Sequence, residues 1–331
     1  MDTSKVTANH IPPYLRTVSG PLNPPDAGIT DAHNHLWISP VQSVPEGAPV
    51  LNNQSAIAAE LIDYHLAGGG TIVDCQPAGC GRDANILREL AEKSEVSIIA
   101  CTGFHLRRYY PDDYWLFKAS TDDASRYFIN ELEVGLEETL SGASPIQAGF
   151  IKIACENSID KSPLPLIEAA VMACLETGAA LEVHTEKGAD AERIVERLVA
   201  FGLSPDRLIL CHVDKRTDFM FHASMAQEGI LLEYDTFYRP KYRPDENVWP
   251  LLEQMVEAGL DMQVAIATDM AEAALWTRLG NGPGLTGLIM QIIPRLETIG
   301  CGTESIRRLT GGTISTRLAR PDPKSLSNPM M

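Results

Sequence analysis

The feature that most constrains the fold of this chain is an eightfold repeat. Each unit is a short run of apolar, often β-branched residues that ends in polar or ionisable side chains, followed by a longer amphipathic segment. The eight runs lie at residues 28–33, 71–76, 97–105, 149–154, 180–185, 208–213, 230–235 and 263–269. Helical patterns are clearest at 56–66, 83–93, 164–177, 189–201 and 248–258. Because strands that alternate with helices form a parallel sheet covered on both faces, the pattern predicts an α/β fold.

Eight units favour closure into a (β/α)8 TIM barrel over an open doubly wound sheet. The open alternative normally carries a glycine-rich phosphate-binding turn after its first strand. The corresponding segment here, DAHNHLW at residues 31–37, contains no glycine. The glycines at 68–70 precede a strand, so they indicate a helix stop. A chain of 331 residues suits one such barrel. We therefore expect the barrel over residues 28–320, an N-terminal extension over 1–27 and a C-terminal tail over 321–331.

Charge and composition restrict the partners. A formal net charge of -17 argues against binding to nucleic acid or to an anionic membrane, because those partners select basic faces. The chain has no run of 18 apolar residues and no signal-peptide pattern at its start, so we expect a cytoplasmic protein with a small-molecule substrate. The seven cysteines lie mostly in apolar runs without metal-type spacing, which predicts reduced core residues.

Ionisable residues gather where the runs end, and barrels of this kind build their active sites at the C-terminal ends of the strands. Two histidines in an H-x-H arrangement project to the same side of a strand, so both can reach one metal. Alone, H-x-H is equally well explained by a hydrogen-bonded or surface pair. Together with candidates on four other strands it predicts a metal centre. The six candidate ligands are His33, His35, Lys152, His184, His212 and Asp269.

Lys152 is the unusual member of this set, because it lies inside the apolar run GFIKIA. Burial lowers the pKa of an ammonium group and favours the neutral amine. Such an amine can add carbon dioxide to form a carbamate, whose two oxygens could bridge two cations. The alternative is an ordinary ion pair of Lys152 with Glu156, Glu182 or Asp269.

Several segments resemble the phosphotriesterase family of the amidohydrolase superfamily. In order they are DAHNHLW, GFIKIA, EVHTEKG, CHVDK, ATDMAEAALWTRLGNGPGL and IPRLETIGCGTESIRRL, and with the segment that follows they extend over about residues 28–318. The resemblance implies a binuclear centre, usually of zinc, and often a homodimer. The ligands it implies are His33, His35 and Asp269 on one metal, His184 and His212 on the other, and a carbamylated Lys152 between them. The segment GGTISTRLA departs from the Asn-Pro-Ala-Arg segment of many relatives, outside the metal ligands.

Such a centre indicates a hydrolase that acts on ester bonds. Two cations supply a bridging hydroxide at neutral pH and polarise a carbonyl or phosphoryl oxygen. Asp269, as the carboxylate of the set, would carry the proton. Two other classes compete: a metal-dependent isomerase or decarboxylase, and a non-catalytic metal-binding protein. A bridging Lys152 argues against the isomerase or decarboxylase, and a carboxylate beside an open metal position argues against the binding protein.

Cationic loops point to an anionic substrate. Arg239 and Lys241 lie in the basic segment FYRPKYRPDE, and both residue types bind phosphate and carboxylate. We add His105 at the end of the third run, and Trp276 and Arg278 after the eighth, as substrate-binding residues. A solvated loop and structural roles for the histidine and tryptophan are the alternatives. An organophosphate pocket would be less cationic. The sequence therefore predicts a lactonase for a polar or anionic sugar lactone, with or without a phosphate group. The alternatives are a phosphotriesterase or another metal-dependent barrel enzyme, such as an isomerase or decarboxylase.

Overall fold

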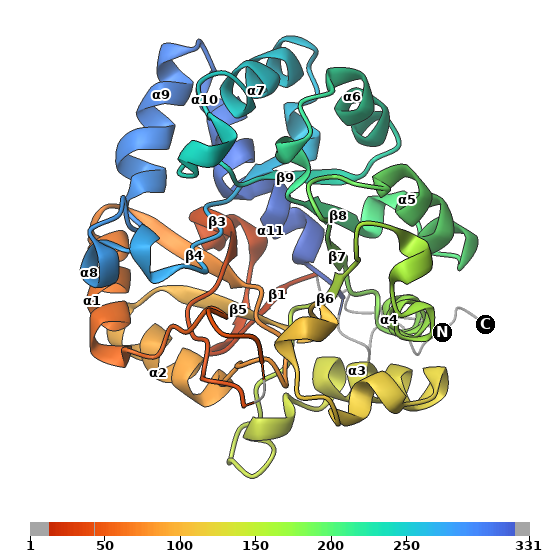
Figure 1. Ribbon diagram of the computed structural model, residues 1–331. Helices are drawn as coiled ribbons and strands as arrows, with labels where there is room; N and C mark the ends of the chain where they lie inside the picture. Colours follow the sequence, from red (N-terminus) through yellow and green to blue (C-terminus); the bar gives the residue numbers. More distant parts are fainter. Residues whose placement is uncertain (1–12, 43, 322–331) are drawn as a thin grey trace, which may run out of the picture.

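Eight parallel strands form a barrel in the computed structural model, which describes residues 13–42 and 44–321 (Figure 1). The strands follow chain order around the ring: β3 Ile29–Asn34, β4 Gly69–Asp74, β5 Ser97–Gly103, β6 Phe150–Ala154, β7 Leu181–His184, β8 Leu208–Cys211, β9 Leu231–Tyr234 and β10 Val264–Ile266. The backbone N–H of Asp269, just beyond β10, donates to the carbonyl oxygen of His33 in β3 at 3.0 Å, which brings the two ends of the sheet together. The predicted (β/α)8 barrel is confirmed, and each predicted run overlaps one strand of the barrel.

Most helices surround the strands on the outside of the barrel, whereas the last one, at residues 313–318, lies near the centre of the view (Figure 1). The α-helices are α1 Gln54–Leu66, α2 Ala84–Ser94, α3 Thr121–Glu133, α4 Leu164–Thr177, α5 Ala191–Ala200, α6 Phe219–Gln227, α7 Val248–Glu257, α8 Thr277–Gly280, α9 Ile293–Thr298, α10 Thr303–Arg307 and α11 Thr313–Leu318, with π-helical turns at Leu288–Ile292 and Arg308–Gly312. Local signals set the ends: the side chain of Asp83 caps α2, and Gly178 ends α4 at φ 71°. The five predicted helical segments correspond to α1, α2, α4, α5 and α7.

The predicted N-terminal extension contains an antiparallel hairpin, β1 Leu15–Thr17 and β2 Gly20–Leu22. Tyr14 pairs with Arg320 through backbone hydrogen bonds, so both ends of the described chain lie together. The remainder of the predicted extension, residues 1–12, and most of the predicted tail, residues 322–331, lie outside the described residues. The domain boundaries therefore stay a prediction.

Two apolar cores explain why the ionisable residues collect at one end of the barrel. One core fills the space between the strands and the surrounding helices. The other fills the barrel interior, where Ile99 and Phe150 from the strands pack with Ile314 and Leu318 of α11. The apolar side chains of α11 close one end of the barrel. The polar residues therefore lie at the other end, where the strands have their C-terminal ends. All seven cysteines are buried and unpaired, as predicted.

The helices formed by residues 13–42 and 44–321 include none with the length and apolar character needed to span a bilayer.

Candidate active site

Five of the six predicted ligands converge above the C-terminal ends of the strands. The Nε2 atoms of His33 and His35 lie 4.0 and 3.7 Å from Asp269 Oδ1, and these three residues could hold one metal ion. The ring of His212 lies 5.0 Å from that of His33 and 4.5 Å from that of His184, between ring centroids. The strands therefore bring together side chains that are up to 236 residues apart, from position 33 to position 269.

Two of these residues adopt a backbone conformation that non-glycine residues rarely take. His212 has φ 64° and Asp269 has φ 45°, both in the left-handed region. Such a conformation costs on the order of 1–3 kcal/mol and persists where the surroundings enforce it. The backbone N–H of His212 donates to Asp235 Oδ2, and that of Asp269 donates to the His33 carbonyl oxygen, each at 3.0 Å. The strain aims both side chains toward the centre of the site.

Two polar residues that the sequence reasoning missed orient the imidazoles. Gln76 Oε1 lies 2.7 Å from His35 Nδ1, and Asp235 Oδ2 lies 2.6 Å from His212 Nδ1. Fixing Nδ1 in this way presents Nε2 as the metal-binding atom. A signal for both was present in the sequence, because Gln76 and Asp235 end two of the predicted strands at the same side of the barrel as the histidines.

The electrostatic state of the donors fits a divalent metal. Burial lowers the pKa of His35 to about 3, and it also lowers the pKa values of His184 and His212. Neutral imidazole is the form that binds metal. Burial would raise the pKa of Asp269, but His212 and Arg239 lower it below its usual range, so this carboxylate is ionised. Neutral nitrogens and an anionic oxygen therefore meet at one place, the donor set that zinc prefers.

His33 differs from the other histidines because two carboxylates lie beneath it. Its Nδ1 is 3.1 Å from both Glu182 Oε1 and Glu233 Oε2. Burial and Lys152 act to lower its pKa, but the two glutamates raise it to about 10. His33 is therefore protonated in the absence of metal. A metal that binds Nε2 has to displace a proton from this ring.

Lys152 corrects one step of the sequence argument. Its side chain is fully buried, and Nζ donates to Glu182 Oε1 at 2.5 Å. Burial alone lowers the pKa of the ammonium, but Cys211 and Glu182 raise it well above its usual range. The expectation that burial leaves a neutral amine is thus wrong for this arrangement. Of the three carboxylates weighed as ion-pair partners, Glu182 is the one in contact.

Glu233 was not predicted as part of the site, and Glu182 was predicted only as one of three alternative ion-pair partners of Lys152. Each lies two residues before an ionisable residue at the end of its strand, so alternation turns both into the barrel. Glu182 Oε2 and Glu233 Oε1 are buried without a hydrogen-bond partner within the part of the chain that the structure describes. Burial and Glu182 raise the pKa of Glu233 to about 7. The site therefore contains two buried carboxyl groups, those of Glu182 and Glu233, in addition to Asp269 of the predicted ligand set.

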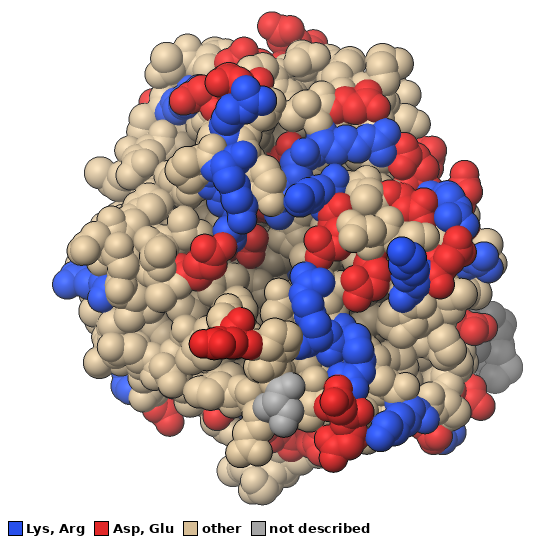
Figure 2. All heavy atoms as spheres, viewed as in Figure 1, with Lys and Arg blue, Asp and Glu red and all other residues tan. Residues whose placement is uncertain are grey.

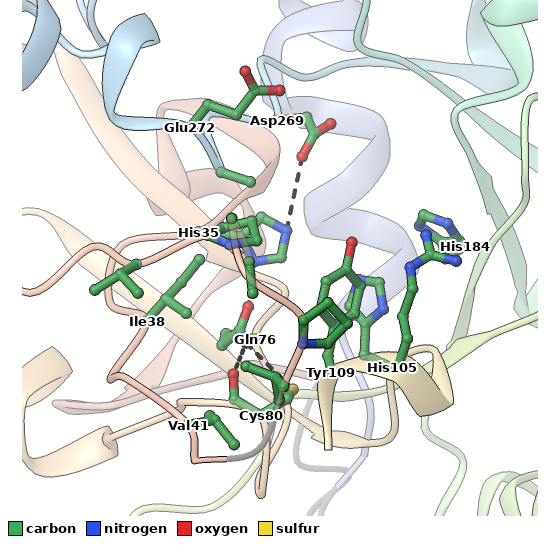
Figure 3. Close-up of a pocket in the computed structure, with 18 of the residues that line it drawn as sticks. His35, Ile38, Val41, Gln76, Cys80, His105, Tyr109, His184, Asp269 and Glu272 are labelled. Atoms are coloured by element: carbon green, nitrogen blue, oxygen red, sulfur yellow. Dashed lines mark hydrogen bonds and ion pairs between the residues drawn. The ribbon is translucent and has the colours of Figure 1, made fainter. Parts of the chain in front are cut away.

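A cavity of about 450 Å³ opens above the histidines, and Figure 2 shows it as a hollow bordered by charged side chains of both signs. In the close-up, His105, Tyr109 and His184 lie on one side and Ile38 and Val41 on the other (Figure 3). Four cationic side chains line the cavity: Arg108, Lys215, Arg239 and Lys241. The Nζ atoms of Lys215 and Lys241 lie 5.5 and 5.3 Å from the ring centroid of Tyr242.

Three of the five predicted substrate-binding residues line this cavity. His105 does so with its ring 5.0 Å from that of His184. Lys241 reaches it from an exposed position. Arg239 also lines it, but it is held by acidic partners: NH2 donates to Asp269 Oδ2 at 2.9 Å, and NH1 donates to Glu272 at 2.7 Å. Arg239 therefore orients Asp269, and its charge is already matched.

The other two predicted residues lie away from the cavity. Trp276 is buried, and its indole N–H donates to the carbonyl oxygen of Met270 at 2.7 Å. Arg278 pairs with Asp63 on α1. Loop packing and an ion pair explain both, so we leave them out of the proposed substrate site. Lys215, three residues after His212 in the motif CHVDK, takes their place. It was missed because a single lysine in a short motif carries no signal of its direction.

Comparison with known proteins agrees with this geometry. The phosphotriesterase family model matches residues 13–310. A phospho-furanose lactonase of Mycoplasmopsis synoviae (strain 53) is 30% identical over 312 residues, which is 88% of each chain. An N-acetyltaurine hydrolase of Salmo salar is 27% identical and covers 89% of this chain and 95% of its own. The crystal structure of an amidohydrolase from Mycoplasma synoviae superposes with a TM-score of 0.85 and 27% identity over 96% of each chain. A lactonase from Listeria monocytogenes gives the same TM-score at 24% identity, over 93% of this chain and 99% of its own. This barrel is an enzyme of the hydrolase type and belongs to the phosphotriesterase family.

Proposed function

We propose that this protein is a binuclear metal-dependent lactonase that opens an anionic, phosphorylated sugar lactone. The observation that carries the proposal is the cavity itself, whose lining combines metal-type donors with cationic side chains. The relative named as a phospho-furanose lactonase supports the same substrate class.

We infer that two divalent metals, zinc by the donor chemistry, are held by the residues that converge there. His33, His35 and Asp269 would hold one metal, and His184 and His212 the other. When bound, the metals would supply Lewis acidity toward water and toward the lactone carbonyl. The neutral state of His35, His184 and His212 supports this assignment, because these rings need not lose a proton to bind.

A carbamate on Lys152 is proposed as the group between the metals. Its support is position: Nζ lies 3.4 Å from both ring nitrogens of His33. The contact with Glu182 opposes it, because that carboxylate holds Nζ as an ammonium. Carbamylation therefore requires this ion pair to open. Labelling with ¹³C bicarbonate and ¹³C NMR of the metal-loaded protein tests the assignment directly.

Asp269 is proposed as the group that moves the proton. Arg239 fixes its Oδ2, while Oδ1 faces His35 and the cavity. From this position Oδ1 can accept a proton from the attacking water and return it to the ring oxygen of the lactone as the ring opens. Arg239 acts through Asp269 as a positioning residue.

The anionic group of the substrate would lie beside Lys215 and Lys241, whose Nζ atoms lie 5.5 and 5.3 Å from the ring centroid of Tyr242. The Lys215 side chain is 11% exposed and therefore shielded from water, whereas Lys241 is exposed. A phosphate there would receive a charge-assisted hydrogen bond from Lys215. Arg239 and Lys241 were predicted for this role from the sequence; we propose Lys215 as its centre, because its amine is the more shielded of the two lysines.

The experiment is a lactone panel, with and without phosphate groups, measured on protein of known metal content. The proposal expects phosphorylated lactones to be the best substrates. A preference for neutral phosphotriesters would contradict the proposal and indicate a phosphotriesterase. Hydrolysis of anionic N-acyl compounds without any lactone activity would contradict it and indicate an amide hydrolase.

A cytoplasmic location and a homodimer remain proposals. The seven unpaired cysteines suit a reducing compartment. Sedimentation of the metal-loaded protein tests the assembly state.

A further inference from the structure

One junction between neighbouring strands of the barrel differs from the others. Among the described residues, β3 and β10 stand at the two ends of the strand order and form no ladder with each other. The other neighbouring strands are joined by parallel ladders. This junction also carries proposed metal ligands on both sides, since His33 lies in β3 and Asp269 follows β10. The contacts that hold the junction together therefore also set the positions of these ligands.

Three buried polar side chains join the two strands, and we call them the junction cluster: Asp31, Asn34 and Thr268. Asp31 accepts two hydrogen bonds from Thr268, from the backbone N–H at 3.0 Å and from the hydroxyl at 2.5 Å. The side-chain amide of Asn34 donates to Asp31 Oδ2 at 2.8 Å and to Thr268 Oγ1 at 2.9 Å. Side-chain hydrogen bonds shielded from water thus connect β3 to the segment after β10.

The junction cluster also fixes the backbone of the two histidines in β3 and just after it. The N–H of His33 donates to Asp31 Oδ1 at 3.4 Å. The N–H of His35 donates to Asn34 Oδ1 at 2.8 Å. Because each histidine is held at its own backbone, the direction of its side chain depends on these two polar residues.

On the other side of the junction, the cluster holds the residue before Asp269. Thr268 bonds to Asp31 through both its N–H and its hydroxyl, and Asp269 follows in the left-handed region at φ 45°. Such a backbone conformation persists where neighbouring contacts enforce it. In Figure 3 the side chains of Asp269 and His35 face one another, with Oδ1 3.7 Å from Nε2.

We propose that the junction cluster positions one of the two proposed metals, the one held by His33, His35 and Asp269. Its three members act through the ligands and are positioning residues. The inference rests on the proposed binuclear centre and assigns residues outside the ligand set to a single metal. The proposed ligands of the other metal come from different strands, since His184 ends β7 and His212 follows β8. Loss of the cluster should therefore weaken one metal selectively.

The test replaces Thr268 by valine, which keeps the shape of the side chain and removes its hydroxyl. Competition between the zinc-loaded full chain and a chelator measures a dissociation constant for each metal. Thr268→Val should raise one of the two constants by about 10- to 100-fold, the usual effect of removing a partner behind a ligand, and leave the other unchanged. Asn34→Ala removes other bonds of the same cluster and should weaken the same metal.

Two matched variants complete the design. Thr102→Val removes an equally buried hydroxyl, which donates to Glu131 at 2.6 Å from β5, a strand without proposed ligands, and should change neither constant. Thr185→Val is the reciprocal variant. The Thr185 hydroxyl donates to the Cys211 carbonyl oxygen at 2.8 Å and so links the ends of β7 and β8. Its loss should raise the constant that Thr268→Val leaves unchanged.

Equal weakening of both metals by Thr268→Val, or no change in either constant, would overturn the positioning role. The metal-free protein gives a second readout, because amide hydrogen exchange at Thr268 and Asp269 should be faster in Asn34→Ala than in Thr102→Val. Equal exchange in these two variants would also contradict the proposal. Failure of the binuclear centre would look different: the unaltered protein would bind a single metal, and Thr268→Val would still have to weaken it.

Discussion

Removal of Lys215 should weaken the binding of an anionic lactone far more than removal of Lys241. Both amines lie near the Tyr242 ring, but their exposure differs: the Lys215 side chain is 11% exposed, whereas Lys241 is exposed to solvent. A charge-assisted hydrogen bond shielded from water contributes about 1.5–3 kcal/mol. An exposed charge pair contributes about 0.2–1 kcal/mol, because water and salt screen it.

These energies translate into different Michaelis constants. Lys215→Ala should raise KM for a phosphorylated lactone by roughly 10- to 150-fold, and Lys241→Ala by no more than about fivefold. The value of kcat should change little in either variant, because a contact remote from the reacting carbonyl binds substrate and transition state alike. Steady-state kinetics at fixed ionic strength measure both parameters.

A neutral lactone with the same ring is the necessary control. Lys215 Nζ lies 3.6 Å from Asp235 Oδ1, and Asp235 orients His212, so its removal could disturb the metal donors. Such damage would affect charged and neutral lactones equally. The reasoning is refuted if Lys215→Ala has the same effect on both lactones, or if Lys241→Ala has the larger effect on the charged one.

Three further predictions concern the metal donors. Asp269→Asn should lower kcat by about two orders of magnitude or more while circular dichroism stays native, and an unchanged rate would assign proton transfer elsewhere. Lys152→Ala should lose activity and tight binding of at least one metal, with partial rescue by short carboxylic acids, whereas full activity would make Lys152 purely structural. Metal affinity should increase from about pH 6 to pH 9, because the pKa of His33 is about 10 without metal and metal must compete with that proton. Calorimetry in buffers of different ionisation enthalpy should record proton release, and its absence would show that His33 is neutral.

The barrel was predictable because its signal is repeated eight times. Period and polarity located every strand of the barrel, and the alternation of side chains along a strand placed His33 and His35 together. Parallel strands put their C-terminal ends at one side, so His184, His212 and Asp269 could be grouped without knowledge of any loop.

The substrate side was harder to predict because loops determine it. Trp276 and Arg278 lie in the loop region after a strand, as the other candidates do, yet a hydrogen bond to Met270 and an ion pair with Asp63 hold them away from the cavity. Arg239 reaches the cavity, but Asp269 and Glu272 already match its charge. Sequence position does not show these pairings.

The charge state of Lys152 could not be predicted from the sequence, because its pKa depends on which charged groups surround it. The sequence supplied the burial and three possible carboxylate partners. The three-dimensional arrangement decided that Glu182 is in contact and that the ammonium is favoured.

The most direct test of the account is elemental analysis of the purified protein, made with excess zinc and bicarbonate and assayed on a phosphorylated lactone. We expect about two metals per chain, loss of lactone hydrolysis on chelation and its recovery when metal returns. A firm stoichiometry of one metal, or full hydrolysis by the metal-free protein, would contradict the binuclear centre.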